Sequence, residues 1–99
     1  MKTTTPSREE VRDILRRCLP SEDYRAVLFG SRARGGEHGR ASDWDIGILG
    51  PTRLHGAVVQ RIREELEALR TLHTFDVVDL SAVPESFRAD VLAEAEPLT

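Results

Sequence analysis

The feature that most constrains the fold is an alternation of strand-like and helix-like segments along the chain. Short runs rich in apolar and β-favouring residues occur at Tyr24–Phe29, Asp43–Leu49 and Phe75–Leu80, and each is followed by turn residues. From Leu54 to Leu72 the apolar residues recur every three or four positions, which predicts an amphipathic helix. Because such elements pack as a sheet covered by helices, we predict an α/β (α+β) fold with a small sheet flanked by helices.

Two further helices are expected near the ends of the sequence. Ser7 and Glu10 have the spacing of a capping box, and the helix they open is predicted to end at Leu19-Pro20. A last amphipathic helix is expected after Ser81–Pro84. Its apolar positions are Phe87, Val91, Leu92 and Ala95. The predicted order is therefore helix, strand, strand, helix, strand, helix.

Length and composition limit the classes of protein that the chain can belong to. With 99 residues it can build one modest core, so we expect a single domain spanning residues 1–99. No run approaches the roughly 18 apolar residues of a membrane span, and the first ten residues do not resemble a secretory signal, so a cytoplasmic protein without membrane contact is expected. The net charge of -3 argues against direct binding of duplex nucleic acid. The lone Cys18 is expected to pack in the core.

The second strand-like run carries two aspartates separated by one residue. Alternation along a strand places Asp43 and Asp45 on one face and Trp44 on the other. Their Cα atoms would lie about 6.6 Å apart, so both carboxylates could converge on a cation. Oxygen-only ligands favour magnesium or manganese over zinc. The alternative is that the two aspartates cap a turn or form a solvated face.

A third carboxylate for such a site could come from the third strand-like run. Alternation places Asp76 and Asp79 on opposite faces of this strand, so only one of them can readily join the site. We choose Asp76, which lies within the strand between apolar neighbours. Asp79 is nearer the following turn, where it is expected to cap the turn or accept a hydrogen bond from Ser81.

The turn Gly30-Ser31 follows the first strand directly. Glycine lets a ligand approach the backbone, and backbone N–H groups at such a turn can bind phosphate. Arg32 and Arg34 could contact phosphate oxygens as well. A P-loop is excluded, because Gly36-Glu37 stands where lysine and Ser/Thr are required. Ser31 lacks the surroundings of a catalytic nucleophile, so a phosphate contact explains it better.

Taken together, GSRARG, SDWDIGI and FDVVDL resemble the motifs of minimal nucleotidyltransferases of the DNA polymerase beta superfamily. The resemblance spans Tyr24 to about Leu80 and implies that superfamily's small mixed sheet flanked by helices. It also implies two magnesium ions, with a nucleoside triphosphate as substrate. The site residues that it implies are Asp43, Asp45 and Asp76 for catalysis and metal binding, and Gly30, Ser31, Arg32 and Arg34 for nucleotide binding.

The acceptor of the transferred group is not evident from the residues. A domain this small has little surface to enclose an acceptor, so a partner is expected to supply it. Stand-alone minimal nucleotidyltransferases resemble the antitoxins of toxin–antitoxin pairs whose toxin is a HEPN ribonuclease, which implies magnesium-dependent transfer of AMP from ATP to a tyrosine of that toxin. The alternatives are a binding module that neutralises its partner without catalysis, and modification of a small molecule, for which the chain lacks an acceptor-binding domain.

Overall fold

The computed structural model describes residues 7–30, 43–69 and 74–99 and confirms the predicted fold class. No helix within these ranges is long and apolar enough to cross a membrane. The elements, in chain order, are α1 (Arg8–Cys18), β1 (Arg25–Phe29), β2 (Asp43–Leu49), α2 (Gly56–Glu67), β3 (Thr74–Asp79), the 3-10 helix η1 (Leu80–Ala82), α3 (Glu85–Glu94) and β4 (Glu96–Pro97).

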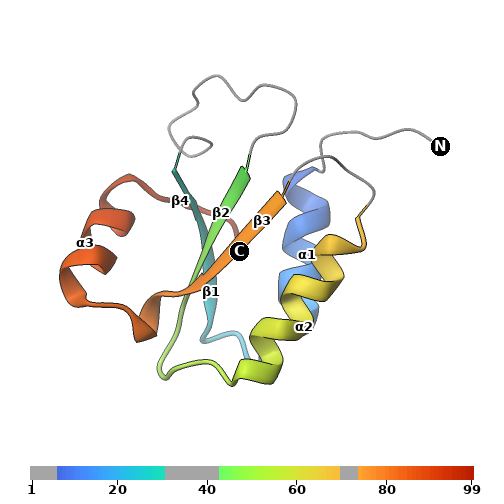
Figure 1. The fold of residues 1–99 in the computed structure, drawn as a ribbon, viewed down its shortest axis with the longest axis horizontal. Coiled ribbons are helices and arrows are strands. Elements are labelled where there is room, and N and C mark those ends of the chain that lie inside the picture. Colours follow the sequence, from blue (N-terminus) through green and yellow to red (C-terminus); the bar gives the residue numbers. More distant parts are fainter. Residues whose placement is uncertain (1–6, 31–42, 70–73) are drawn as a thin grey trace.

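The four strands form one mixed sheet in the order β3-β2-β1-β4 (Figure 1). β1 runs antiparallel to both β2 and β4, whereas β2 and β3 run parallel. The end of β1 and the beginnings of β2 and β3 therefore meet at one edge of the sheet.

Helices cover both faces of this sheet. Figure 1 shows α1 and α2 on one side and α3 on the other. The predicted capping box is present at the start of α1, because the Ser7 hydroxyl accepts the Glu10 N–H at 3.1 Å and the Glu10 carboxylate accepts the Ser7 N–H at 2.9 Å. α1 ends at Cys18 with Leu19 as its C-cap, as the sequence predicts.

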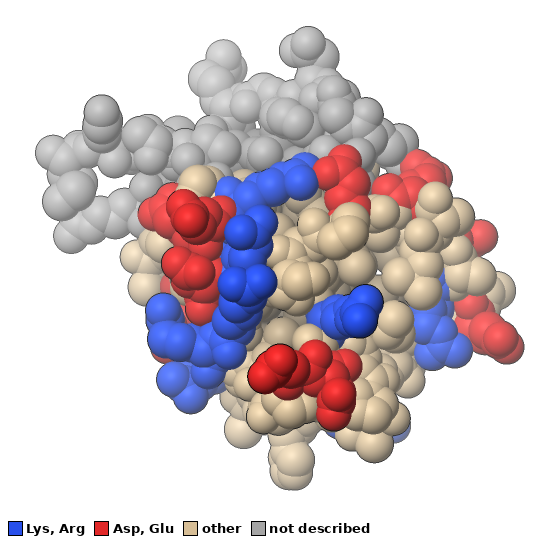
Figure 2. All heavy atoms as spheres, turned by 180° about the vertical axis from the view of Figure 1, so that it is seen from behind, with Lys and Arg blue, Asp and Glu red and all other residues tan. Residues whose placement is uncertain are grey.

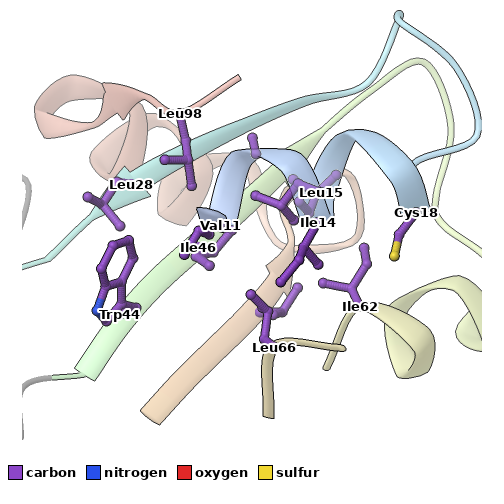
Figure 3. Packing of buried hydrophobic residues seen from close by; sticks show 13 residues of the cluster. Val11, Ile14, Leu15, Cys18, Leu28, Trp44, Ile46, Ile62, Leu66 and Leu98 are labelled. Carbon is purple, nitrogen blue, oxygen red and sulfur yellow. The ribbon is translucent and has the colours of Figure 1, made fainter. Parts of the chain in front are cut away.

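The main core lies between the sheet and the α1–α2 layer (Figure 3). Trp44, Ile62 and Leu66 are at most 1% exposed there, and each such side chain contributes roughly 1.5–3 kcal/mol by leaving water. Cys18 is also buried, which confirms its predicted packing role. The other members of this core are Val11, Ile14, Leu15, Ala26, Leu28, Ile46, Ile48, Val77 and Leu98.

Two predicted helices differ from the structure. α2 begins at Gly56 and ends at Glu67, so it is shorter than the periodic segment from Leu54 to Leu72. The last helix is less buried than its pattern indicates, because Phe87 is 44% and Leu92 39% exposed, while Val91 is buried. The apolar periodicity of α3 thus does not correspond to a fully covered helix face.

Charged side chains of both signs lie next to each other on the surface. Figure 2 shows a column of arginine side chains with acidic side chains beside it. Arg17 of α1 donates to Glu65 of α2, and Arg61 Nε also lies 3.6 Å from a Glu65 oxygen. The Arg17 hydrogen bond lowers the pKa of Glu65, and it raises that of Arg17.

Candidate active site at the sheet edge

The first component of the site is the turn that follows β1. Phe29, the last residue of β1, pairs with Asp45 of β2, which brings Gly30 next to the Asp45 side chain. Gly30 has a φ of 77°, a backbone angle that residues with a side chain rarely adopt. A Cβ placed on Gly30 would lie 2.3 Å from Oδ2 of Asp45, so glycine is also the only residue type that leaves room for this carboxylate.

The second component is the pairing of two aspartates on neighbouring strands. In the parallel ladder between β2 and β3, Asp45 is the register partner of Asp76. Register partners direct their side chains to the same face of a sheet, so the two carboxylates lie side by side. Asp45 is half-buried and Asp76 is exposed. The backbone of Asp43, paired with Thr74, continues this row of residues toward the sheet edge, and its side chain lies outside the described part of the chain.

The opposite face of the same strands is firmly packed. Trp44 is 1% exposed, as predicted for a residue facing away from the aspartates. Its ring centroid lies 5.8 Å from that of Phe75, its register partner on β3. This tilted aromatic pair fixes the two strands relative to each other directly behind the carboxylates.

Asp79 has a separate role in the fold. Its Oδ2 accepts the Leu54 N–H at 2.8 Å, and its Oδ1 accepts the Ser81 N–H at 3.0 Å. It therefore ties the start of η1 to the segment that precedes α2, and the predicted hydrogen bond from Ser81 is present. Both carboxylate oxygens accept hydrogen bonds from backbone N–H groups, as is typical of a capping residue.

The remaining predicted site residues cannot be placed. Ser31, Arg32 and Arg34 lie outside the described residues, so their assignment to the nucleotide site stays a prediction. Among the described side chains, no three acidic, histidine or cysteine residues are grouped so that they could hold a metal ion. The adjacent carboxylates of Asp45 and Asp76 nevertheless provide the oxygen-only surroundings that suit magnesium.

Sequence reasoning missed one neighbour of this site. A hollow of about 180 Å³ lies between the end of β1 and α3, on the side of Gly30 away from Asp76. It is lined by Phe29, Gly30, Phe87, Asp90, Val91 and Glu94. The sequence pattern predicts the helix but carries no signal that it crosses the face of the sheet that bears Asp45.

Comparison with known proteins identifies the family. A family model described as polymerase beta, nucleotidyltransferase, matches residues 20–99. The chain belongs to this nucleotidyltransferase family. Its polymerase beta fold is confirmed by structural neighbours, and the predicted resemblance to minimal nucleotidyltransferases of this superfamily is thereby confirmed as well. A search of curated proteins found no match.

Solved structures of similar fold are toxin–antitoxin complexes. One is a toxin–antitoxin with AMP-PNP, which is 26% identical to the nucleotidyltransferase described here, with a TM-score of 0.75 over 95% of this chain and 73% of that chain. A mutant of the pair MntA-HpeT has 25% identity and a TM-score of 0.74, covering 96% of this chain and 73% of that one. A tri-AMPylated Shewanella oneidensis HEPN toxin in complex with MNT antitoxin has 22% identity, a TM-score of 0.67 and coverage of 93% and 68%.

Proposed function

We propose that this nucleotidyltransferase is an antitoxin that transfers AMP from ATP to a tyrosine hydroxyl of a HEPN-type partner toxin, in a reaction that requires magnesium. The observation that carries the proposal is the register that sets Asp76 beside Asp45, with the Gly30 turn against the Asp45 carboxylate. Family membership supports nucleotidyl transfer. The similarity to a toxin–antitoxin structure with AMP-PNP supports an adenine nucleotide and a toxin partner.

Adenylylation of the partner is favoured over neutralisation by binding alone. A structure of the same fold contains a toxin that carries AMP, which makes adenylylation of the partner the reaction to test first. A hydroxyl acceptor suits the site, because the exposed Asp76 carboxylate is accessible to a group presented by another protein. Neither the hollow beside Gly30 nor a larger one around Tyr24 is lined by Asp76, so neither would enclose a small acceptor next to this carboxylate.

The proposed step is an in-line displacement at the α-phosphorus of ATP. The backbone of the Gly30-Ser31 turn, with Arg32 and Arg34, holds the β- and γ-phosphates. The acceptor oxygen forms a bond to the α-phosphorus while the bond from phosphorus to the pyrophosphate oxygen breaks, and Asp76 takes the hydroxyl proton. Two magnesium ions held by Asp43, Asp45 and Asp76 would supply charge neutralisation and acidify the acceptor hydroxyl.

The experiment that tests this function is intact-mass spectrometry of the protein encoded by the neighbouring gene. That protein is incubated with ATP, magnesium chloride and either the parent chain, the Asp45→Asn variant, the Asp43→Asn, Asp45→Asn double variant or the control Asp13→Asn, which changes an exposed carboxylate of α1. We expect added AMP units with the parent chain and the control, and none with the Asp45 variants. A stable complex without any AMP gain would overturn the proposal in favour of neutralisation by binding alone.

A further inference from the structure

The hollow beside Gly30 has features of a protein-docking surface rather than of a second nucleotide site. Its walls are apolar at Phe29, Phe87 and Val91, and Phe87 remains 44% exposed. Asp90 and Glu94, one helical turn apart on α3, add two carboxylates to its lining. A site that joins aromatic surface to carboxylates complements a cationic side chain with an aliphatic stem.

The charges on α3 point to a basic occupant. All of α3 is described, and its exposed charged residues are acidic: Glu85, Asp90 and Glu94. Its one cation, Arg88, is half-buried and donates to the carbonyl of Leu80 at 3.2 Å. Asp45 lies on the same side of the sheet, next to Gly30, and adds a further carboxylate to those described near the hollow. A second copy of α3 would bring like charges together.

The position of the hollow relates it to the acceptor. Across the sheet the order is Asp76, Asp45, Gly30 and then the hollow, so a partner that presents a hydroxyl to Asp76 must lie over this same face. We propose that the hollow formed by Phe29, Phe87, Asp90 and Val91 docks an arginine or lysine side chain of the partner protein and thereby positions its acceptor hydroxyl at the site. This inference rests on the proposed function, because it assumes that the partner is the acceptor.

The docking surface also accounts for the weak burial of α3. An exposed phenylalanine next to an open hollow costs solvation free energy in the isolated chain, and a partner that covers it recovers that free energy. The guanidinium of an arginine would lie over the Phe87 ring and pair with Asp90, a combination in which desolvation strengthens both contacts. A lysine would offer the same charge with fewer fixed hydrogen bonds.

The experiment measures the dissociation constant between this chain and the neighbouring gene's product by isothermal titration without nucleotide. The variants are Asp90→Lys, Asp90→Asn and Phe87→Ala. The control Glu67→Lys makes the same charge change at an exposed position at the end of α2, on the other side of the sheet. We expect Asp90→Lys to weaken binding about tenfold or more and Asp90→Asn by a smaller factor, while Glu67→Lys stays within about twofold of the parent. Phe87→Ala should weaken binding as Asp90→Asn does, and the affinity of the parent should fall with rising salt.

The outcomes separate this inference from the proposed function. If the parent transfers AMP and Asp90→Lys binds the partner as tightly as the parent does, the docking proposal is wrong and the proposed AMP transfer is retained. If Asp90→Lys no longer binds the partner while the parent adds no AMP to it, the hollow is a docking site for the partner and the proposed AMP transfer is wrong. Titration with AMP-PNP completes the test, because an equal loss of nucleotide affinity in Asp90→Lys would assign the hollow to the nucleotide and overturn the proposal. The proposal would also be overturned if the parent chain self-associated with rising concentration and Asp90→Lys abolished this self-association.

Discussion

The carboxylate of Asp45 lies against the Cα of Gly30, so closely that a Cβ at Gly30 would stand 2.3 Å from its Oδ2 atom. The contact arises because Phe29 pairs with Asp45 in the β1–β2 ladder, and the chain then turns at Gly30 with a φ of 77°. One residue therefore satisfies two requirements, a backbone angle that disfavours side chains and a space that admits no methyl group. The turn that is proposed to bind phosphate and a proposed metal ligand are thus positioned by the same pair of strands.

Replacing Gly30 with alanine should disrupt the site more than the fold. The methyl group must displace the Asp45 carboxylate, and the backbone angle adds strain of about 1–2 kcal/mol. We expect Gly30→Ala to remain folded, with an unfolding free energy lowered by about that amount, and to lose most of its affinity for AMP-PNP. Urea unfolding and isothermal titration measure the two effects.

A matched control is available at Gly56, the first residue of α2, where a Cβ would meet no atom within 4 Å. Gly56→Ala should leave AMP-PNP affinity unchanged and raise the unfolding free energy by about 0.4–1 kcal/mol, because alanine restricts the unfolded chain. Equal AMP-PNP affinity in the Gly30→Ala variant and the parent would contradict the proposed contact between turn and nucleotide.

The two aspartates of β3 should respond to substitution in opposite ways. Asp76 is exposed beside Asp45, so Asp76→Asn is expected to abolish AMP transfer and to leave the unfolding free energy within about 0.5 kcal/mol of the parent. Asp79→Ala removes the acceptor of the Leu54 and Ser81 N–H groups and should cost about 1–3 kcal/mol. Mass spectrometry of the partner and urea unfolding give the two readouts. The assignment is wrong if Asp76→Asn retains transfer, or if Asp79→Ala is as stable as the parent.

The sequence predicts the bounds of β2 and the carboxylate face of that strand because both follow from local alternation, whereas the predicted bounds of the first and third strands each differ by one residue from Arg25–Phe29 and Thr74–Asp79. Asp43–Leu49 is predicted with the bounds that the structure has, and Trp44 is buried opposite Asp45 as a period of two requires. Alternation also indicates that only one of Asp76 and Asp79 can join that face, and Asp76 is chosen because it lies within the strand between apolar neighbours. Local alternation cannot predict which strands pair. The parallel register that places Asp45 next to Asp76 joins two segments that are separated by a helix in the sequence.

Other features depend on contacts that leave no local pattern. β4 consists of two residues, Glu96–Pro97, too short for alternation to be visible, and it exists because Leu98 enters the core. The apolar spacing of α3 predicts a covered face, yet Phe87 remains exposed, because it lines an open hollow between α3 and the end of β1. Spacing shows which residues share a helix face, but not how much sheet lies beneath it.

Acid should weaken the link between α1 and α2. The hydrogen bond from Arg17 lowers the pKa of Glu65, so this pair contributes stability above the ordinary glutamate pKa of about 4.3, and the contribution is lost as pH falls through the lowered value. Both side chains are solvent-accessible, so the contribution is small and salt-sensitive. We expect the difference in urea midpoint between the parent and Glu65→Gln to be present at pH 6 and to shrink as the pH falls through the lowered pKa of Glu65.

The C-terminal residues of the described chain should be essential to the sheet that carries the site. Leu98 is 2% exposed, its N–H donates to the Ala26 carbonyl at 2.8 Å, and its own carbonyl accepts from Arg12 Nε at 2.8 Å. Leu98→Ala leaves a cavity beside β1 and should lower the unfolding free energy by about 2–4 kcal/mol without changing the slope with urea concentration. Leu92→Ala removes the same atoms from a side chain that is 39% exposed and should cost less than about 1 kcal/mol. Equal losses in the two variants would show that β4 does not anchor β1, and hence that the Gly30 turn is held by its pairing with β2 alone.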